Sequence, residues 1–328
     1  MAYTENGIFI PKGKIAVASS FEGIVNDGCP ECFLTSINAY SGMEEGKGKF
    51  YNKVIEPEDF GEARKGREMK AFRRLRPIVE LAEDYVTILE TIHSNPELIE
   101  ELLNDPDNWE IYEPILEKFF HRRAESDDLR ARFKEEFYDE RKRMQDRDFR
   151  EWVKTQGPFE GMIPQYKLLV ETQKKNDDPD PYSSIESGFV PWFATSKDEA
   201  STFSLCSFYA AVGLIDEEDV GSEDSDMCVI KRDRIIGKER TRDKIEQLKM
   251  IADKEGVPRS NVWRLNDRYD KDQQLRLRDE GFPYQFLIKG GYAFPHDVAA
   301  ADEDSFIIVM ERDEFAKRLS QYAEKWGF

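Results

Sequence analysis

The sequence has few of the residues that would cross-link it or place it in a membrane. Its 328 residues include only four cysteines and three histidines, which argues against a disulfide framework and favours reduced thiols. No window approaches the roughly 20 apolar residues of a membrane-spanning helix. Residues 1–14 lack the basic stretch and apolar run of a secretory signal. We therefore expect a cytoplasmic protein that does not insert into a membrane.

The chain also lacks the positive charge of a nucleic-acid-binding protein. Its formal net charge is −19 at pH 7, which repels the phosphates of nucleic acids and of anionic membranes. We expect neither partner. Charged residues make up 35% of the chain, above the usual value of about 25%, and such an excess suits the exposed faces of long helices. A chain of this length is expected to form roughly two domains.

The first strong signal is a short run of mostly apolar residues near the start of the chain. Residues 14–20 have the sequence Lys-Ile-Ala-Val-Ala-Ser-Ser and lead into a glycine-containing segment, residues 21–28. This pattern predicts a buried parallel strand followed by a loop.

Residues 57–175 have a different composition, in which charges dominate and apolar residues recur at helical spacing. The region is predicted to be mostly helical, divided by prolines, with Pro77 interrupting the longest helix. The polar segment 176–181 then predicts a linker.

After this linker, strands and helices alternate. The predicted strands span residues 189–194, 227–230, 261–265, 284–288 and 306–310, and the predicted helices span residues 199–214, 241–255, 271–280 and 313–326. This order predicts a three-layer α/β core with a mainly parallel sheet and right-handed crossovers. The first strand belongs to the same sheet. We therefore predict that residues 1–28 and 183–328 form the α/β core domain and that residues 29–182 form an inserted all-α domain.

Ligands of open α/β sheets bind at the carboxyl ends of the strands, so the polar residues that follow the strands are the candidates for a site. In chain order they are Ser20, Glu22, Thr195, Ser196, Lys238, Asp267, Asp270 and Asp272.

The order of these residues resembles the four motifs of haloacid-dehalogenase-type hydrolases. That family carries Asp-x-Asp-Gly-Thr after its first strand, then a Thr or Ser, a Lys, and a late acidic pair. Here the counterparts are Ser20-Phe-Glu-Gly-Ile24, Thr195, Lys238 and the segment Asn266 to Asp272. The likeness spans the whole chain, because the helical insertion stands where the family places a cap. It implies a Rossmannoid core, a cap domain and a Mg²⁺-dependent phosphatase acting on a small phosphorylated metabolite.

The resemblance also implies a role for each residue. Asp267, with Asp270 or Asp272 and with Glu22, would supply the oxygen ligands that Mg²⁺ prefers. Glu22 would also be the general acid and base. The phosphate would be bound by Lys238, by Thr195 and Ser196, and by the backbone N–H groups from Phe21 to Gly23.

Ser20 departs from the family, whose nucleophile at this position is a carboxylate that also binds the metal. A serine hydroxyl needs a base to take its proton, and the loss of one carboxylate weakens Mg²⁺ binding. Three explanations stay open: a natural pseudo-enzyme, a deliberate replacement that traps a ligand, or a hydrolase with a modified mechanism. A catalytically silent binding or regulatory protein with the same fold is the alternative function.

Cys29 and Cys32 have the spacing of half a zinc site or of a redox pair. The sequence contains no second pair of this spacing, so local packing at the start of the insertion is the favoured interpretation.

Overall fold

The computed structural model describes residues 2–51, 53–124, 128–175, 185–221 and 228–328. The chain divides into two compact units. The sheet unit comprises Met1–Asp27, Pro158–Ala293 and Asp297–Phe328, and the helical unit comprises Gly28–Gly157 and Phe294–His296. The predicted linker at residues 176–181 lies outside the described residues. None of the described helices is both long enough and apolar enough to cross a lipid bilayer.

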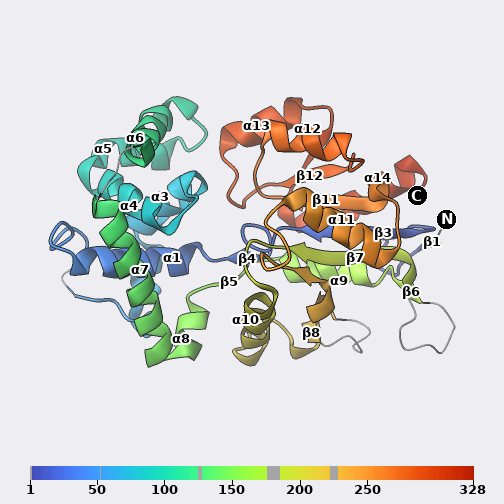
Figure 1. The fold of residues 1–328 in the computed structure, drawn as a ribbon, viewed down its shortest axis with the longest axis horizontal. Coiled ribbons are helices and arrows are strands. Elements are labelled where there is room, and N and C mark those ends of the chain that lie inside the picture. Colours follow the sequence, from blue (N-terminus) through green and yellow to red (C-terminus); the bar gives the residue numbers. More distant parts are fainter. Residues whose placement is uncertain (1, 52, 125–127, 176–184, 222–227) are drawn as a thin grey trace. The chain divides into compact units, whose positions relative to one another are not determined.

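A seven-stranded sheet forms the centre of the sheet unit (Figure 1). Six of its strands are parallel and lie in the order β10-β7-β3-β11-β12-β13, while β6 pairs antiparallel with β7. The strands are β3 (Lys14–Ser19), β6 (Lys174–Lys175), β7 (Ile185–Ala194), β10 (Ile235–Ile236), β11 (Val262–Asn266), β12 (Gln285–Ile288) and β13 (Ile307–Met310). The predicted fold class, a three-layer α/β core with a mainly parallel sheet plus an all-α domain, is confirmed.

The chain order of the parallel strands reverses between β3 and β11. From β3 the chain proceeds outward through β7 to β10, and it then returns to β11 on the other side of β3. The connections that leave β3 and β11 therefore run in opposite directions, and open α/β sheets bind their ligands at the carboxyl ends of two such strands. This position is where the fold itself favours a ligand site.

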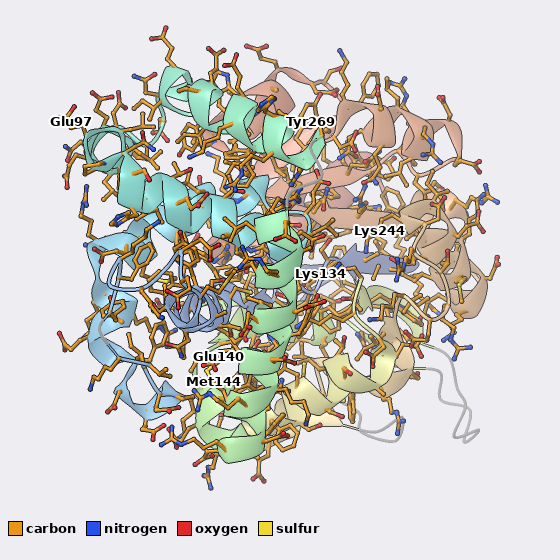
Figure 2. All side chains as sticks on the ribbon, turned by 60° about the vertical axis from the view of Figure 1, so that its left-hand side comes forward. Glu97, Lys134, Glu140, Met144, Lys244 and Tyr269 are labelled. Carbon is orange, nitrogen blue, oxygen red and sulfur yellow. The ribbon has the colours of Figure 1, made fainter. Side chains whose placement is uncertain are left out.

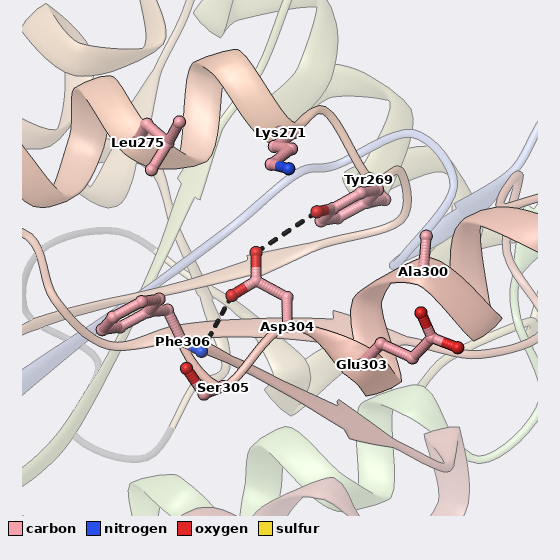
Figure 3. Close-up of a pocket in the computed structure, with 8 residues that line it drawn as sticks. All are labelled: Tyr269, Lys271, Leu275, Ala300, Glu303, Asp304, Ser305 and Phe306. Carbon is pink, nitrogen blue, oxygen red and sulfur yellow. Dashed lines mark hydrogen bonds between the residues drawn. The ribbon is translucent and has the colours of Figure 1, made fainter.

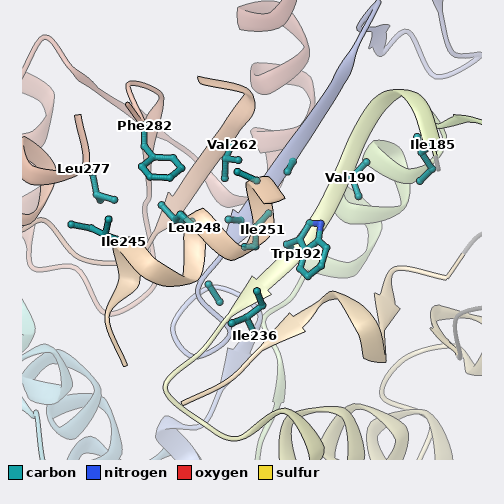
Figure 4. Packing of buried hydrophobic residues seen from close by; sticks show 14 residues of the cluster. Ile185, Val190, Trp192, Ile236, Ile245, Leu248, Ile251, Val262, Leu277 and Phe282 are labelled. Atoms are coloured by element: carbon teal, nitrogen blue, oxygen red, sulfur yellow. The ribbon is translucent and has the colours of Figure 1, made fainter. Parts of the chain in front are cut away.

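One face of the sheet is covered by α11 (Lys244–Glu255) and α12 (Lys271–Asp279). Alternate residues of the central strands point to this face because side chains along a strand alternate between the two faces. They form a core with Ile245, Leu248 and Ile251 of α11 and Leu277 of α12 (Figure 4).

The opposite face is covered by α9 (Met162–Val170) and α14 (Phe315–Trp326). Here Trp263 of β11 is fully buried and contacts the rings of Phe189, Phe286 and Trp326. On α9, the hydroxyl of Tyr166 donates to Ser19 Oγ. Helices thus cover both faces of the sheet.

The remaining elements of the sheet unit lie at its margins. They are the antiparallel pair β1 (Ala2–Tyr3) and β2 (Phe9–Ile10), the parallel pair β8 (Val220–Gly221) and β9 (Ile230–Lys231), and α10 (Glu199–Ala211). The chain passes between the two units near β4 (Asn26–Asp27), near β5 (Gly157–Pro158) and at α13 (Pro295–Glu303).

The helical unit contains no strand among its described residues apart from Gly157 at its end. Its helices are α1 (Cys29–Gly42), α2 (Gly61–Lys65), α3 (Arg67–Leu75), α4 (Tyr85–Ser94), α5 (Pro96–Asn104), α6 (Glu113–Ala124), α7 (Asp128–Arg147) and α8 (Phe149–Lys154). Charged side chains such as Glu97 and Lys134 are exposed on them (Figure 2). As predicted, the long helix is interrupted at Pro77, which lies in a 3₁₀ turn after α3 because proline cannot donate the next helical hydrogen bond.

Buried ion pairs hold the helical unit together internally. Glu31 of α1 is 3% exposed and accepts two hydrogen bonds from Arg141 of α7, at 2.8 and 2.6 Å. Asp84 is 1% exposed and pairs with Arg123 and Arg130 at 2.5 and 2.7 Å. Removing one partner of such a pair would leave a buried charge uncompensated.

Two features of the structure differ from the sequence prediction. The insertion ends at Gly157 instead of 182, because α9 packs on β7 and belongs to the sheet unit. The predicted strand at 227–230 begins outside the described residues, and its described end enters β9, which pairs with β8 away from the main sheet. The third strand of the main sheet is β10, which follows shortly after.

Replacing Trp263 with alanine should lower the free energy of unfolding by about 3–5 kcal/mol, because the surrounding rings cannot fill the cavity. Urea unfolding followed by circular dichroism measures the change. Leu275, which is 38% exposed, provides the control, and its alanine variant should lose less than about 1 kcal/mol. Equal losses in both variants would contradict the described core.

Candidate functional site

The loops that leave β3 and β11 contact each other at the carboxyl ends of these strands. The backbone N–H of Ser20 donates to the carbonyl of Leu265 at 3.3 Å, which extends the β3–β11 register by one residue. The Ser20 hydroxyl donates to Asn266 Oδ1 at 3.4 Å. Two of the predicted motifs, far apart in the sequence, are therefore in direct contact.

Two glycines allow the loops to approach Asp267 closely. Gly23 has a φ of 82°, and a Cβ atom at this position would lie 1.9 Å from Asp267 Oδ2. Gly291 follows β12, and its Cβ would lie 2.3 Å from the Gly23 carbonyl oxygen and 3.1 Å from Asp267 Cβ. Only glycine fits at either position without a shift of the backbone. Asp267 is 6% exposed as a result of this packing.

Glu22 is held by a cation that the sequence reasoning did not include. Its Oε1 lies 2.5 Å from Lys197 Nζ and accepts a hydrogen bond from Asn26 Nδ2 at 3.0 Å. Lys197 comes from the loop after β7, so this ion pair connects the first two predicted motifs. The Glu22 carboxylate, which was expected to act as the general acid and base, is therefore already bound to Lys197 and Asn26.

Thr195, the first residue of the loop after β7, also lies at the carboxyl ends of the strands. Thr195 is buried, and its Oγ1 accepts a hydrogen bond from the Lys197 N–H at 3.1 Å, whereas Ser196 is exposed. Of the backbone N–H groups expected to bind phosphate, that of Gly23 donates instead to the Asn26 carbonyl at 3.1 Å. The predicted N–H cradle is thus reduced to Phe21 and Glu22.

Lys238 is exposed, and the contact that the structure describes for it is a backbone hydrogen bond to the Lys197 carbonyl at 2.9 Å. Lys244 instead reaches the carboxyl edge of the sheet. Its Nζ donates to the carbonyl of Ala194, the last residue of β7, at 2.9 Å, and to Gln247 Oε1 at 3.0 Å. The missed signal is Asp243, which caps α11 and therefore places Lys244 at the first position of the helix.

The charge of Asp267 acts on two cations, the half-buried Lys244 and the buried Arg264. Burial and the charge of Arg264 lower the pKa of Lys244, the charge of Asp267 raises it, and the net result is a pKa of about 8. Burial likewise lowers the pKa of Arg264 to about 10. Arg264 Nη2 donates to Gln273 Oε1 at 2.6 Å, whereas its Nη1 is buried without a partner. The sequence reasoning did not identify this arginine.

The structure does not bring the four predicted metal ligands together. Asp270 is exposed and caps α12 by accepting from the Gln273 N–H at 3.0 Å, and Asp272 is exposed on the first turn of that helix. Within the part of the chain that the structure describes, no three His, Cys, Asp or Glu side chains gather as metal ligands would. The residue before Asp267 is the neutral Asn266, whose side chain contacts the neutral Ser20.

The four cysteines are free thiols. Cys32 Sγ lies 3.6 Å from Glu31 Oε2 and accepts a hydrogen bond from Arg141 at 3.6 Å. Burial raises the pKa of Cys32, which disfavours the thiolate that metal binding and redox exchange require. These contacts support the packing interpretation of Cys29 and Cys32.

A separate hollow of about 470 Å³ lies beside α12 and α13 (Figure 3). Its lining includes Lys271, Glu303 and the exposed ring of Phe306, and Tyr269 donates to Asp304 across it at 3.2 Å. None of the predicted site residues lines this hollow, so it is not part of the β3–β11 site.

No protein-family model and no curated protein matches the sequence. Among solved structures, the chain is similar to a haloacid dehalogenase-like hydrolase from Streptococcus pneumoniae, with 10% identity, a TM-score of 0.46, and 93% and 98% of the two chains covered. It is also similar to a protein assigned as a phosphoglycolate phosphatase from Lactobacillus delbrueckii, with 12% identity, a TM-score of 0.48, and 95% and 98% coverage. A protein assigned as a β-phosphoglucomutase from Thermotoga maritima gives 12% identity, a TM-score of 0.45, and 94% and 99% coverage. Identities of this size carry no information on substrate.

Replacing Gly291 with alanine should force the loop after β12 away from the loops after β3 and β11, which Gly23 and Asp267 occupy, and lower the free energy of unfolding by roughly 1–3 kcal/mol. Thermal and urea unfolding measure this loss. Gly13 has open space around it, so Gly13→Ala is the control and should be nearly neutral. A neutral Gly291→Ala variant would contradict the close approach of the loops.

Lys244 should make stability depend on pH. Its pKa is lower in the folded protein, about 8, than its ordinary value of 10.5, so between these values the unfolded chain binds more protons and the free energy of unfolding rises with pH. In this window, the free energy of unfolding of the parent protein should rise, relative to that of Lys244→Met, by up to about 1.4 kcal/mol per pH unit. Urea unfolding at several pH values tests this, and a constant difference between the two proteins would refute it.

Proposed function

We propose that the chain is a haloacid-dehalogenase-type protein that binds the phosphate group of a small phosphorylated metabolite and has an impaired hydrolytic step. The phosphate would bind at the carboxyl ends of β3 and β11, here called the β3–β11 edge. The observation that carries the proposal is the direct contact of the Ser20 loop with Asn266 and Asp267 at the reversal of strand order. The reaction class, phosphate-ester hydrolysis, comes from analogy with the family that the chain resembles. The groups that would bind the phosphate are those of the residues at this edge.

The residues at this edge suit an anion. Lys244 places a cation beside the end of β7, and the Thr195 hydroxyl is free to donate, because its described contact uses the oxygen as an acceptor. The N–H groups of Phe21 and Glu22 add donors at the end of β3. Cations and donors of this kind stabilise the equatorial oxygens of a phosphoryl group.

The hydrolytic step lacks an activated nucleophile. The Ser20 hydroxyl donates to Asn266 Oδ1, an amide oxygen that cannot take up its proton at neutral pH. Glu22, the nearest carboxylate in the sequence, is paired with Lys197. Without a base, a serine hydroxyl is a weak nucleophile.

The donor set does not fit a resident Mg²⁺ ion of the kind that the resemblance implies. Asp267 is the one buried carboxylate at the edge, Glu22 is engaged by a lysine, and Asp270 and Asp272 are exposed on α12. Mg²⁺ dehydrates reluctantly and is usually bound through carboxylates and substrate phosphates.

The alternative function is a catalytically silent binding or regulatory protein, which the neutral Ser20 favours. Assaying the chain beside Ser20→Asp on a panel of phosphate esters with Mg²⁺ separates the two. We expect Ser20→Asp to hydrolyse at least one ester about 10²-fold faster or more, because it restores an ionised nucleophile. A fully active parent chain would contradict the impaired step, and equal inactivity of both proteins would favour the silent alternative.

Lys244, instead of Lys238, should bind the phosphate. Lys244→Met should weaken inorganic phosphate binding by about tenfold or more, which corresponds to about 1.4 kcal/mol. Lys238→Met should leave the affinity nearly unchanged, because that side chain is exposed. Isothermal titration at pH 7 measures both, and the reverse result would restore the assignment made from the sequence.

A further inference from the structure

The side chains at the β3–β11 edge form an uncommon set of charges for a site that resembles a metal-dependent one. Ser20 is neutral, and the charge of Glu22 is balanced by Lys197 at 2.5 Å. What remains is one carboxylate, Asp267, together with two cations, the half-buried Lys244 and the buried Arg264. Lys244 lies close enough to Arg264 and Asp267, and Arg264 close enough to Asp267, for these charges to influence the pKa values of the two cations.

The sheet register places these cations on the side of the edge that Ser20 faces. Side chains alternate along a strand, so Ser20 continues the row of Ala16 and Ala18, which faces α11. By the same alternation, Arg264 lies on the row of Val262 in the same core, and the Lys244 Nζ contacts the end of β7 on this side. Arg264 Nη1 is buried there without a partner.

We infer that this site binds the phosphate group without a divalent cation, with Lys244 and Arg264 supplying the positive charge that a metal would otherwise provide. The inference rests on the proposed phosphate-binding function and specifies its ligand as an oxyanion alone. A divalent ion placed beside Asp267 would face two cations, the half-buried Lys244 and the buried Arg264, and a single carboxylate. Like charges at short range in a partly buried site repel strongly. An oxyanion at the same place is attracted to both cations.

The replacement of a carboxylate by Ser20 is consistent with this charge set. An aspartate at this position would add the second carboxylate that a divalent ion needs, and it would repel a phosphate in the absence of that ion. The serine removes both effects. Metal independence is thus expected from the same substitution that weakens the nucleophile.

Titration of the full chain with inorganic phosphate at pH 7, once with a chelator and once with Mg²⁺, tests the inference. We expect the two dissociation constants to agree within about twofold, and we expect titration with Mg²⁺ alone to give no binding heat. If phosphate binds only in the presence of Mg²⁺, the inference is overturned and the proposed function stands. If phosphate binds under neither condition, the proposed function fails as well.

The Ser20→Asp variant provides a second arm. With two carboxylates at the edge, its phosphate affinity should rise about tenfold or more when Mg²⁺ is added. Ser260→Asp adds the same charge just before the amino end of β11, at the opposite edge of the sheet, and should keep metal-independent binding. Circular dichroism and thermal unfolding show whether each variant is folded. A Ser20→Asp variant that is folded and binds phosphate without any response to Mg²⁺ would show that the charge balance at this position does not set metal dependence, and it would overturn the inference.

Discussion

The close approach of the loops after β3 and β11 is the contact on which the rest of the site depends. Parallel pairing of these strands brings Ser20 to Asn266, and the reversal of strand order at this point leaves their loops free to diverge. Two glycines then allow the backbone to close around Asp267 at distances that any Cβ atom would prevent. The backbone geometry at these glycines therefore determines where the buried Asp267 carboxylate lies.

Electrostatics at this edge favour an anion over a metal ion. Of the other predicted carboxylates, Glu22 is paired with a lysine, Asp270 caps a helix and Asp272 is exposed. The remaining one, Asp267, is accompanied by the buried Arg264 and the half-buried Lys244. Burying cations with too few opposite charges costs free energy, as the lowered pKa values of Lys244 and Arg264 indicate. Groups held in this way are typical of functional sites, because a ligand of opposite charge offsets the cost.

The buried charges of the helical unit are paired within that unit. Its buried carboxylates, Glu31 and Asp84, are each satisfied by arginines of the same unit. Such pairs contribute little net stability compared with apolar packing, but each requires its partner and so favours one arrangement of the helices. Cys32 belongs to this packing, in contact with Glu31 and Arg141.

The sequence by itself determined the strand-helix order, the parallel sheet, the helical insertion and the residues at the strand ends, because periodicity and strand position are local properties of the chain. It could not determine that Asp270 caps a helix, that Glu22 pairs with Lys197, that α9 returns to the sheet, or that Lys244 reaches the carboxyl end of β7. Each of these depends on which side chains meet across the fold, and a difference of a few residues in a helix start decides which lysine reaches the sheet. The tertiary structure alone decided the charge balance of the site, because that balance is a sum over residues far apart in sequence.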